Sequence, residues 1–322
     1  MDDQLNTEAR ETMALADKAL IAVTMDLEMS RHYPTWGMTR WDFEKGNLDE
    51  PSKAYAMETC RRVKAVGGVV HSFLLGRTLE QENVDWLRQM IRDGHVLGNH
   101  TYDHVKINAR TADTIQFRFR LAPWLIRGRP LQEVIVNNIR MTAEAASERL
   151  GVQLRGFRTP YGFPQGMAGR PDVQQMLLDL GFTWVSSMYR QPQDLKRTSP
   201  SEANFAAITA CLEASQPFAY SSGLLEVPAA PITDVNAFRT RRWKLAEYLE
   251  SVRRNVQWTI ENRAVYDFAL HPSVMCVEDP ELRVVDMICG LVEKAGKKAA
   301  LADLDAIARR AKRVVPPDLK GK

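Results

Sequence analysis

Two histidines, His100 and His104, lie four positions apart in the segment GNHTYDH, just after a short apolar run. At this spacing two rings can point the same way on one helical turn, and neutral imidazole nitrogens bind zinc and similar divalent ions. Glu28, which follows an earlier apolar run, can supply a third ligand. Two imidazoles and one carboxylate leave metal positions open for water and substrate, so the pattern is typical of a catalytic site rather than a closed structural one.

Other polar residues also end apolar runs, namely Asp26, Arg158 and His271. Parallel α/β barrels build their active sites at the carboxyl ends of the strands, so these residues are candidates for the same site. For each residue alone, a helix cap or an ion pair is the simpler interpretation. The whole set, taken with the three candidate ligands, is harder to explain by separate structural roles.

The elements that must position these residues alternate between strands and helices. Strands are expected at residues 19–26, 69–75, 95–98, 154–160, 182–187, 224–228 and 265–272. Helices are expected at about 51–66, 131–150, 171–181, 235–262 and 281–295, and from a capping box at Thr78 and Gln81 to Gly94. This alternation predicts an α/β fold, a distorted (β/α)7-type barrel with a parallel sheet. Residues 188–222 have no assignment.

Length and composition set the remaining limits. We expect one domain across residues 1–322, with an N-terminal helix at about 5–18 and a short basic C-terminal tail. With 45% hydrophobic and 26% charged residues, the chain is typical of a soluble globular protein. The net charge of +3 gives no reason to expect nucleic acid or a membrane as a partner. The acidic N-terminus lacks the features of a signal peptide, so a cytoplasmic location is expected.

Several common kinds of site are absent from the sequence. The four cysteines are scattered and form no CxxC pair, which argues against a zinc ribbon or a redox motif. No P-loop, dinucleotide-binding glycine motif or G-x-S-x-G nucleophile elbow occurs. The histidine and carboxylate set is therefore the best candidate for chemistry.

The order of these residues resembles the polysaccharide deacetylase superfamily (NodB-homology, carbohydrate esterase family 4). The family's second motif, H-[ST]-x-x-H, is matched in full by residues 100–104, and its third, R-x-P-[YF]-G, by residues 158–162. Its first motif is matched by residues 24–28 and its last, an L-H pair at a strand end, by residues 270–271. The resemblance spans residues from about 20 to 305. It implies a barrel that hydrolyses an amide bond with the help of a metal.

The resemblance also implies a role for each residue of the site. Glu28, His100 and His104 would be the metal ligands, with zinc as the expected metal and cobalt, nickel, manganese or iron as alternatives.

The same resemblance makes Asp26 the general base, with Arg158 orienting it, and His271 the general acid. The backbone N–H of Tyr161 would complete an oxyanion hole. Amide hydrolysis needs these parts, because one carboxylate must take a proton from water and an imidazolium must give one to the departing amine.

The fourth motif departs from the family. An aspartate is expected in strand 182–187 beside a tryptophan, but Val185 stands there. If that acid pairs with Arg158, another carboxylate must replace it, and Glu226 and Asp267 are both candidates.

Three residues are predicted to contact the substrate. They are Trp184 of the fourth motif, Leu270 of the last motif, and Trp36 in the aromatic-rich segment 31–46. Aromatic faces in that segment can stack on a sugar ring, but a hydrophobic lid that packs on the barrel rim explains them equally well.

Three functions remain open from the sequence. The first is metal-dependent N-deacetylation of an amino sugar or a polysaccharide precursor. The second is hydrolysis of a non-sugar amide, cyclic imide or ureide, and the third is a catalytically silent barrel that binds a glycan. A small molecule or glycan is expected as the substrate, and a homo-oligomer is left open.

Overall fold

The structure is a computed structural model that describes residues 14–29, 44–193, 195 and 198–314. Most of the expected N-terminal helix, the substrate contact Trp36 and most of segment 31–46 lie outside the described residues, and so does the tail from residue 315.

Strands and helices alternate through most of the described chain. The strands are β1 (Ala19–Leu27), β2 (Val70–Leu74), β3 (Val96–Asn99), β4 (Phe157–Phe163), β5 (Trp184–Met188), β6 (Phe218–Ala219), β7 (Leu225–Glu226), β8 (Val265–Leu270) and β9 (Ala299–Leu301). The α-helices are α3 (Glu50–Ala65), α4 (Asp85–Arg92), α5 (Ala112–Ile115), α6 (Phe117–Leu121), α7 (Leu131–Leu150), α8 (Pro171–Asp179), α9 (Glu202–Glu213), α10 (Leu245–Asn262), α11 (Pro272–Glu278), α12 (Arg283–Ala295) and α13 (Leu304–Val314). Short 3₁₀ turns cover Gly76–Glu80, Pro123–Leu125 and Gly296–Lys298, and a π-helical turn covers Val235–Thr240.

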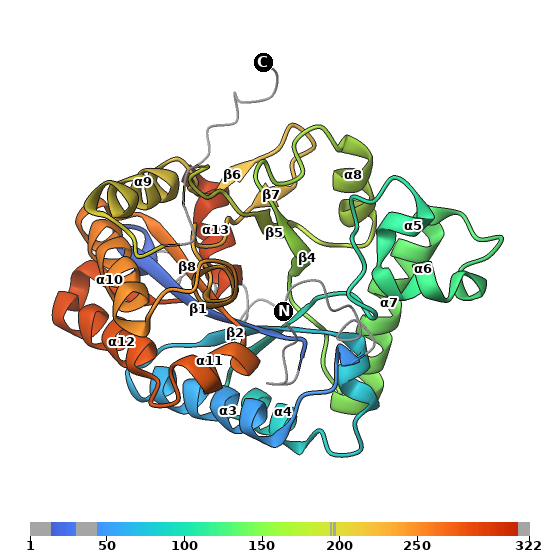
Figure 1. The fold of residues 1–322 in the computed structure, drawn as a ribbon, viewed down its shortest axis with the longest axis horizontal. Helices are drawn as coiled ribbons and strands as arrows, with labels where there is room; N and C mark the ends of the chain where they lie inside the picture. Colours follow the sequence, from blue (N-terminus) through green and yellow to red (C-terminus); the bar gives the residue numbers. More distant parts are fainter. Residues whose placement is uncertain (1–13, 30–43, 194, 196–197, 315–322) are drawn as a thin grey trace.

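The strands form one curled sheet with helices around it (Figure 1). Its order is β6-β7-β5-β4-β3-β2-β1-β8, with β9 paired to the start of β1. All pairs are parallel except β6 with β7. The segment after β7 reaches toward β8 at the opposite edge of the sheet, where the Ala230 N–H donates to the Asp267 carbonyl at 3.0 Å. The predicted distorted α/β barrel is thus confirmed, in an incompletely closed form.

Apolar and polar side chains on the inner face of the sheet lie at opposite ends of the strands. Successive residues of a strand point to opposite faces, so Leu20 and Ala22 of β1 share the inner face with Thr24 and Asp26. Leu20 and Ala22 belong to an apolar cluster in which α13 also packs. The amino-terminal half of the inner face is therefore an apolar core, and the carboxyl-terminal half is left for polar chemistry.

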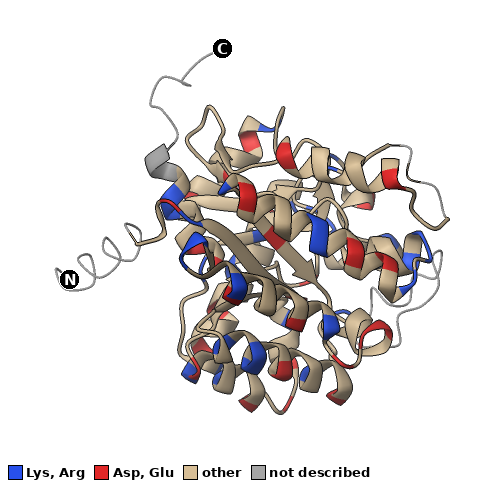
Figure 2. Ribbon diagram, turned by 90° about the vertical axis from the view of Figure 1, so that its left-hand side faces the viewer, with Lys and Arg blue, Asp and Glu red and all other residues tan. Residues whose placement is uncertain are grey.

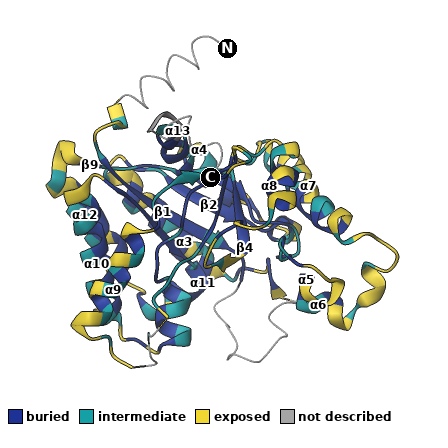
Figure 3. Ribbon diagram, turned by 90° about the horizontal axis from the view of Figure 1, so that it is seen from above, coloured by how far each residue is buried: buried dark blue, intermediate teal, exposed yellow. Residues whose placement is uncertain are grey.

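The outer face is covered by helices. Ile21, Val23 and Met25 of β1 lie in a large cluster with side chains of α3, α10 and α12. Buried residues concentrate in the strands and on the inner sides of these helices, whereas their outer sides are exposed (Figure 3). Lysine, arginine, aspartate and glutamate are interspersed along the outer helices (Figure 2).

Local signals explain where several helices begin and end. Asp49 caps α3 by accepting the Ser52 N–H at 3.1 Å, and proline stands in the first turn of α3 and of α8. Gly151 ends α7 with φ of 70°, which glycine adopts without strain. These boundaries agree with the prediction.

The predicted capping box at residues 78–81 is wrong. The Thr78 hydroxyl donates to the Leu27 carbonyl at 3.2 Å, and the Gln81 amide donates to the Leu48 carbonyl at 2.8 Å. Both side chains tie the 3₁₀ turn to β1 and to the start of α3. The helix starts later, at Asp85.

One other expectation needs correction. The helix predicted over 235–262 is split into the π-helical turn and α10, because Arg242 has φ of 61° and the buried Trp243 returns its N–H to the Ala237 carbonyl at 3.0 Å. The unassigned segment 188–222 contains α9 and β6. Among the described residues, no helix is long and apolar enough to cross a membrane.

Gly156 and Gly151 offer a matched test of packing against the inner face. Both have φ near +70°, but a Cβ at Gly156 would lie 1.8 Å from the Trp184 ring, whereas one at Gly151 would meet nothing within 4 Å. Gly151→Ala should lose about 1–2 kcal/mol of unfolding free energy from the left-handed backbone alone. Gly156→Ala should lose a further ~1–3 kcal/mol from overpacking, measured by urea unfolding. Equal losses would contradict this account of the core.

Candidate active site

Arg158 lies at the centre of the polar half of the inner face. Its Nη1 contacts Asp26 Oδ1 at 3.0 Å, and its Nη2 is paired with Asp267 on β8. The guanidinium stands 4.3 Å above the centre of the Phe73 ring, and its Nε donates to Ser186 Oγ at 3.3 Å. Arg158 is thereby held in one orientation, and it fixes Asp26 at the end of β1.

Asp267, rather than Glu226, takes the place of the missing acid beside Arg158. Its second oxygen accepts the Thr24 hydroxyl at 2.7 Å. Glu226 lies on the opposite face of the sheet, where it accepts N–H groups from residues 187 and 188 and the Tyr220 hydroxyl. The residue at 185 packs in an outer apolar cluster, so a side chain there points away from Arg158. Of the two candidates that the sequence left open, Asp267 is thus the one that pairs with Arg158.

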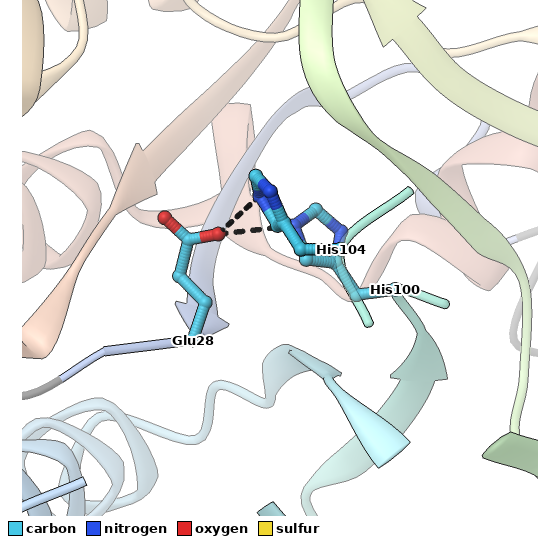
Figure 4. Close-up of side chains that lie close together, drawn as sticks. All are labelled: Glu28, His100 and His104. Atoms are coloured by element: carbon cyan, nitrogen blue, oxygen red, sulfur yellow. Dashed lines mark ion pairs between the residues drawn. The ribbon is translucent and has the colours of Figure 1, made fainter. Parts of the chain in front are cut away.

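Glu28, His100 and His104 meet beside this network, as predicted (Figure 4). Glu28 Oε2 lies 2.5 Å from His104 Nε2 and 3.5 Å from His100 Nε2. Both rings are turned toward this one carboxylate oxygen, and all three side chains are buried.

The two histidines do not lie on a helical turn, which corrects the predicted local structure. Residues 101–104 form an irregular loop after β3, with φ of 64° at Thr101 and 58° at His104. Asn99 Oδ1 accepts the Thr101 N–H at 2.9 Å, and Thr101 Oγ1 accepts the Val105 N–H at 3.0 Å. These side-chain hydrogen bonds stabilise an unusual backbone that a helix would not provide.

The donor set fits a divalent ion. One ligand atom from each of the three residues lies within 4.8 Å of the others. His100 gives its Nδ1–H to the Arg158 carbonyl at 3.0 Å, which leaves the Nε2 lone pair facing Glu28. Burial and the nearby Lys45 lower the pKa of His104 to about 3, so its imidazole is neutral, as a ligand must be.

Lys45, which no sequence motif indicated, also reaches this cluster. Lys45 Nζ lies 2.9 Å from Glu28 Oε2 and 3.2 Å from His104 Nε2. Burial raises the pKa of Glu28, but Lys45 and His104 outweigh it, and the pKa is held well below its usual range. Glu28 is therefore a carboxylate at neutral pH.

His271 follows β8 and faces the same space from the other side. Its Nε2 lies 3.7 Å from Asp26 Oδ2 and 3.4 Å from Glu28 Oε1. Its Nδ1 donates to Asp234 Oδ1 at 2.8 Å, and its backbone N–H donates to Asp234 Oδ2 at 2.6 Å. The buried Asp234, which no sequence motif indicated, therefore fixes both the tautomer and the ring orientation of His271.

The charges of Asp26 and His271 suit a base and an acid. Burial raises the pKa of Asp26, but the Arg158 guanidinium outweighs it, and the pKa falls below its ordinary value. Burial lowers the pKa of His271, but Asp234 and Glu28 raise it well above its ordinary value. At neutral pH the site thus holds a carboxylate and an imidazolium on either side of the candidate ligands.

A pocket of about 390 Å³ opens above these residues. Tyr161 lines it with φ of 65°, and its ring tilts over the His104 ring at 4.9 Å between centroids. Further lining residues are Met29, Thr159, Gly162, Ser187, Met188, Tyr189, Gln191, Thr233 and Asn236.

Two predicted substrate contacts are not brought to this pocket. Trp184 is buried in the apolar half of the inner face and donates its indole N–H to Asp305 of α13 at 2.7 Å. Leu270 points to the outer face and packs beneath the helices. Its neighbours Ala269 and His271 line the pocket instead, as the alternation of a strand requires.

A family model described as polysaccharide deacetylase matches residues 43–185. The predicted resemblance to polysaccharide deacetylases is confirmed. Members of this family hydrolyse carbon–nitrogen bonds other than peptide bonds, so the predicted enzyme class is confirmed as well. The matched range contains His100, His104 and Arg158, whereas Asp26 and His271 lie outside it and reach the site through the fold.

Solved structures share the fold of this chain at low sequence identity. One assigned to the polysaccharide deacetylases, from Mycobacterium smegmatis, has a TM-score of 0.63 and 14% identity and covers 94% of this chain and 93% of its own. Another of the same assignment, from Pseudomonas aeruginosa PAO1, has a TM-score of 0.60 and 12% identity, with coverage of 95% and 94%. The allantoinase Puue has a TM-score of 0.59 and 12% identity, with coverage of 92% and 90%. No curated protein sequence matches the chain.

The Asp234–His271 contact predicts a change in pH dependence. In Asp234→Asn the negative charge that favours the imidazolium is lost while burial remains, so the pKa of His271 should fall. The basic limb of the kcat/KM profile, and the His271 resonance in an NMR titration, should both move to lower pH. The stability that the raised pKa contributes is present below pH of about 6.5 and is lost as pH rises through the folded pKa, so the two proteins should differ least at high pH.

Asp279→Asn provides the control, because Asp279 is also buried but caps α12 by accepting the Arg283 and Val284 N–H groups. A basic limb that moves equally in both variants, or in neither, would show that Asp234 does not set the charge of His271.

Proposed function

We propose that the chain hydrolyses an amide bond with a divalent metal, preferably zinc, held by Glu28, His100 and His104. N-deacetylation of an amino sugar or of a polysaccharide precursor is the proposed reaction. The observation that carries the proposal is the position of Asp26. Arg158 holds this carboxylate beside the candidate ligands, and it lies outside the Glu28, His100 and His104 cluster, so it is available as a base.

Each residue of the site then has one task. When bound, the ion would polarise the amide carbonyl and lower the pKa of a water molecule. Asp26 accepts the proton of the attacking water, and Arg158 keeps its carboxylate ionised and oriented. His271, held by Asp234, donates a proton from Nε2 to the departing nitrogen. The backbone N–H of Tyr161 is proposed as a donor to the oxyanion of the tetrahedral intermediate.

The volume of the pocket supports a small reacting group. About 390 Å³ is at the low end of the range for small-molecule sites, which suits one N-acetylated sugar unit. A small non-sugar amide, cyclic imide or ureide fits the same volume and is the second candidate. Assays of N-acetylated amino sugars and of cyclic ureides, run side by side, distinguish the two reactions.

Metal removal tests the proposal directly. Dialysis against a chelator should abolish hydrolysis of whichever substrate is turned over, and Zn²⁺ or Co²⁺ should restore it. His104→Ala should behave like the chelated protein and should retain less than stoichiometric metal by elemental analysis. Full activity after chelation would contradict the metal-dependent mechanism. Stoichiometric metal without turnover of any acylated amine would instead support a silent glycan-binding barrel.

The assignment of Asp26 predicts a separate kinetic effect. Asp26→Asn keeps the shape of the side chain but removes the base, so kcat should fall by about 10²–10⁴-fold while the metal content stays unchanged. Asp172→Asn removes the same charge from an exposed side chain on α8 that pairs with Arg170, and it should leave kcat unchanged. Loss of metal together with activity in Asp26→Asn would make Asp26 a ligand rather than the base.

A further inference from the structure

Lys45 is anchored at the candidate metal centre by the backbone that follows it. The N–H of Gly46 donates to the Glu28 carbonyl at 2.8 Å, which places Lys45 beside Glu28. Gly46 has φ of 88°, and a Cβ there would lie 2.5 Å from the Cβ of Arg77. Only glycine meets both requirements. The side chain of Lys45 is 1% exposed, so its ammonium is enclosed in the site rather than resting on the surface.

The ammonium contacts the same atoms that a metal would need. Lys45 Nζ is within 3.2 Å of His104 Nε2 and within 2.9 Å of Glu28 Oε2, the oxygen toward which both histidines are turned. An ammonium group has three donors and no acceptor, so it cannot join a ligand set while it keeps its charge. The ammonium can therefore only take the position beside Glu28 and His104 that another cation would otherwise occupy.

We propose that Lys45 is a built-in counter-cation that competes with the divalent ion for Glu28 and His104. The proposal rests on the proposed function in one respect, namely that these residues bind a metal. When the ion enters, the ammonium must leave both atoms, and the four-carbon stem of lysine allows its head to swing into the pocket that Lys45 also lines.

Competition has opposite effects on the two states of the protein. In the metal-free protein Lys45 neutralises a buried carboxylate that would otherwise be costly to leave unpaired, so the fold does not depend on metal. In the metal-bound protein Lys45 places a positive charge close to another cation, which weakens binding. The residue therefore lowers metal affinity and stabilises the protein before the metal is loaded.

Metal titrations of variants test this role without relying on activity. Wild type, Lys45→Met, Lys45→Gln and the control Lys53→Met are titrated with Co²⁺ by absorption spectroscopy and with Zn²⁺ by calorimetry. Lys53 pairs with Glu50 on α3 and does not line the pocket, so its variant removes the same charge elsewhere. Both Lys45 variants should bind metal about tenfold or more tightly than wild type and Lys53→Met. Either Lys45 variant suffices if the other does not fold.

Thermal unfolding gives a second readout. The metal-free Lys45 variants should have a lower Tm than wild type, and saturating metal should raise their Tm by more. Equal or weaker metal binding by the Lys45 variants, with wild type still binding, would overturn the competition but leave the proposed function standing. Absence of binding in all four proteins would overturn the metal-dependent function, and the competition with it.

Discussion

The burial of Arg158 between two carboxylates is the constraint on which the site depends. Taking a guanidinium and its partners out of water costs several kcal/mol per ion, so such a network is weak evidence for added stability. Its effect is to fix geometry. Arg158 on β4 binds Asp26 of β1 and Asp267 of β8. Thr24 of β1 accepts a hydrogen bond from Arg158 and donates one to Asp267. Three strands that are distant in the chain must therefore be in register before the base is in position.

Asp267 illustrates how this network divides the work between its two acids. Burial raises its pKa to about 6, although Arg158 and Thr24 act in the opposite direction. Asp26, at the open end of β1, has a lowered pKa and stays ionised. Asp267 thus serves as the structural partner of the arginine, and Asp26 stays charged at the pocket to lower pH than Asp267 does.

Strand ends and short motifs made much of the site predictable from sequence. Glu28, His100 and His104 each follow an apolar run, and residues that end parallel strands meet at one edge of the sheet. The same reasoning could not find Asp234 or Lys45, because each comes from a connection whose path depends on the whole fold. Lys45 is placed by the hydrogen bond from Gly46 to the Glu28 carbonyl just after β1, and no local sequence pattern indicates that bond.

Two of the predicted substrate contacts do not line the pocket, one because of its position along its strand and the other because of the face on which it lies. Trp184 lies on the inner face but too near the amino end of β5, where it packs in the apolar half. Leu270 lies at the carboxyl end of β8, near the pocket, but its side chain is on the outer face. Family motifs indicate which segment of the chain lies near the site. The position of a residue along its strand, and the face of the sheet on which it lies, decide whether its side chain can contact a substrate.

The packing of α13 against the apolar half of the inner face determines where the substrate can enter and where the products can leave. Ile307 and Leu304 of this helix join side chains of β1 and β5 and fill the amino-terminal end of the curled sheet. The pocket lies at the opposite end of the strands. The substrate must enter, and both products must leave, through the opening of this pocket. Each product must therefore leave before another substrate molecule can occupy the pocket.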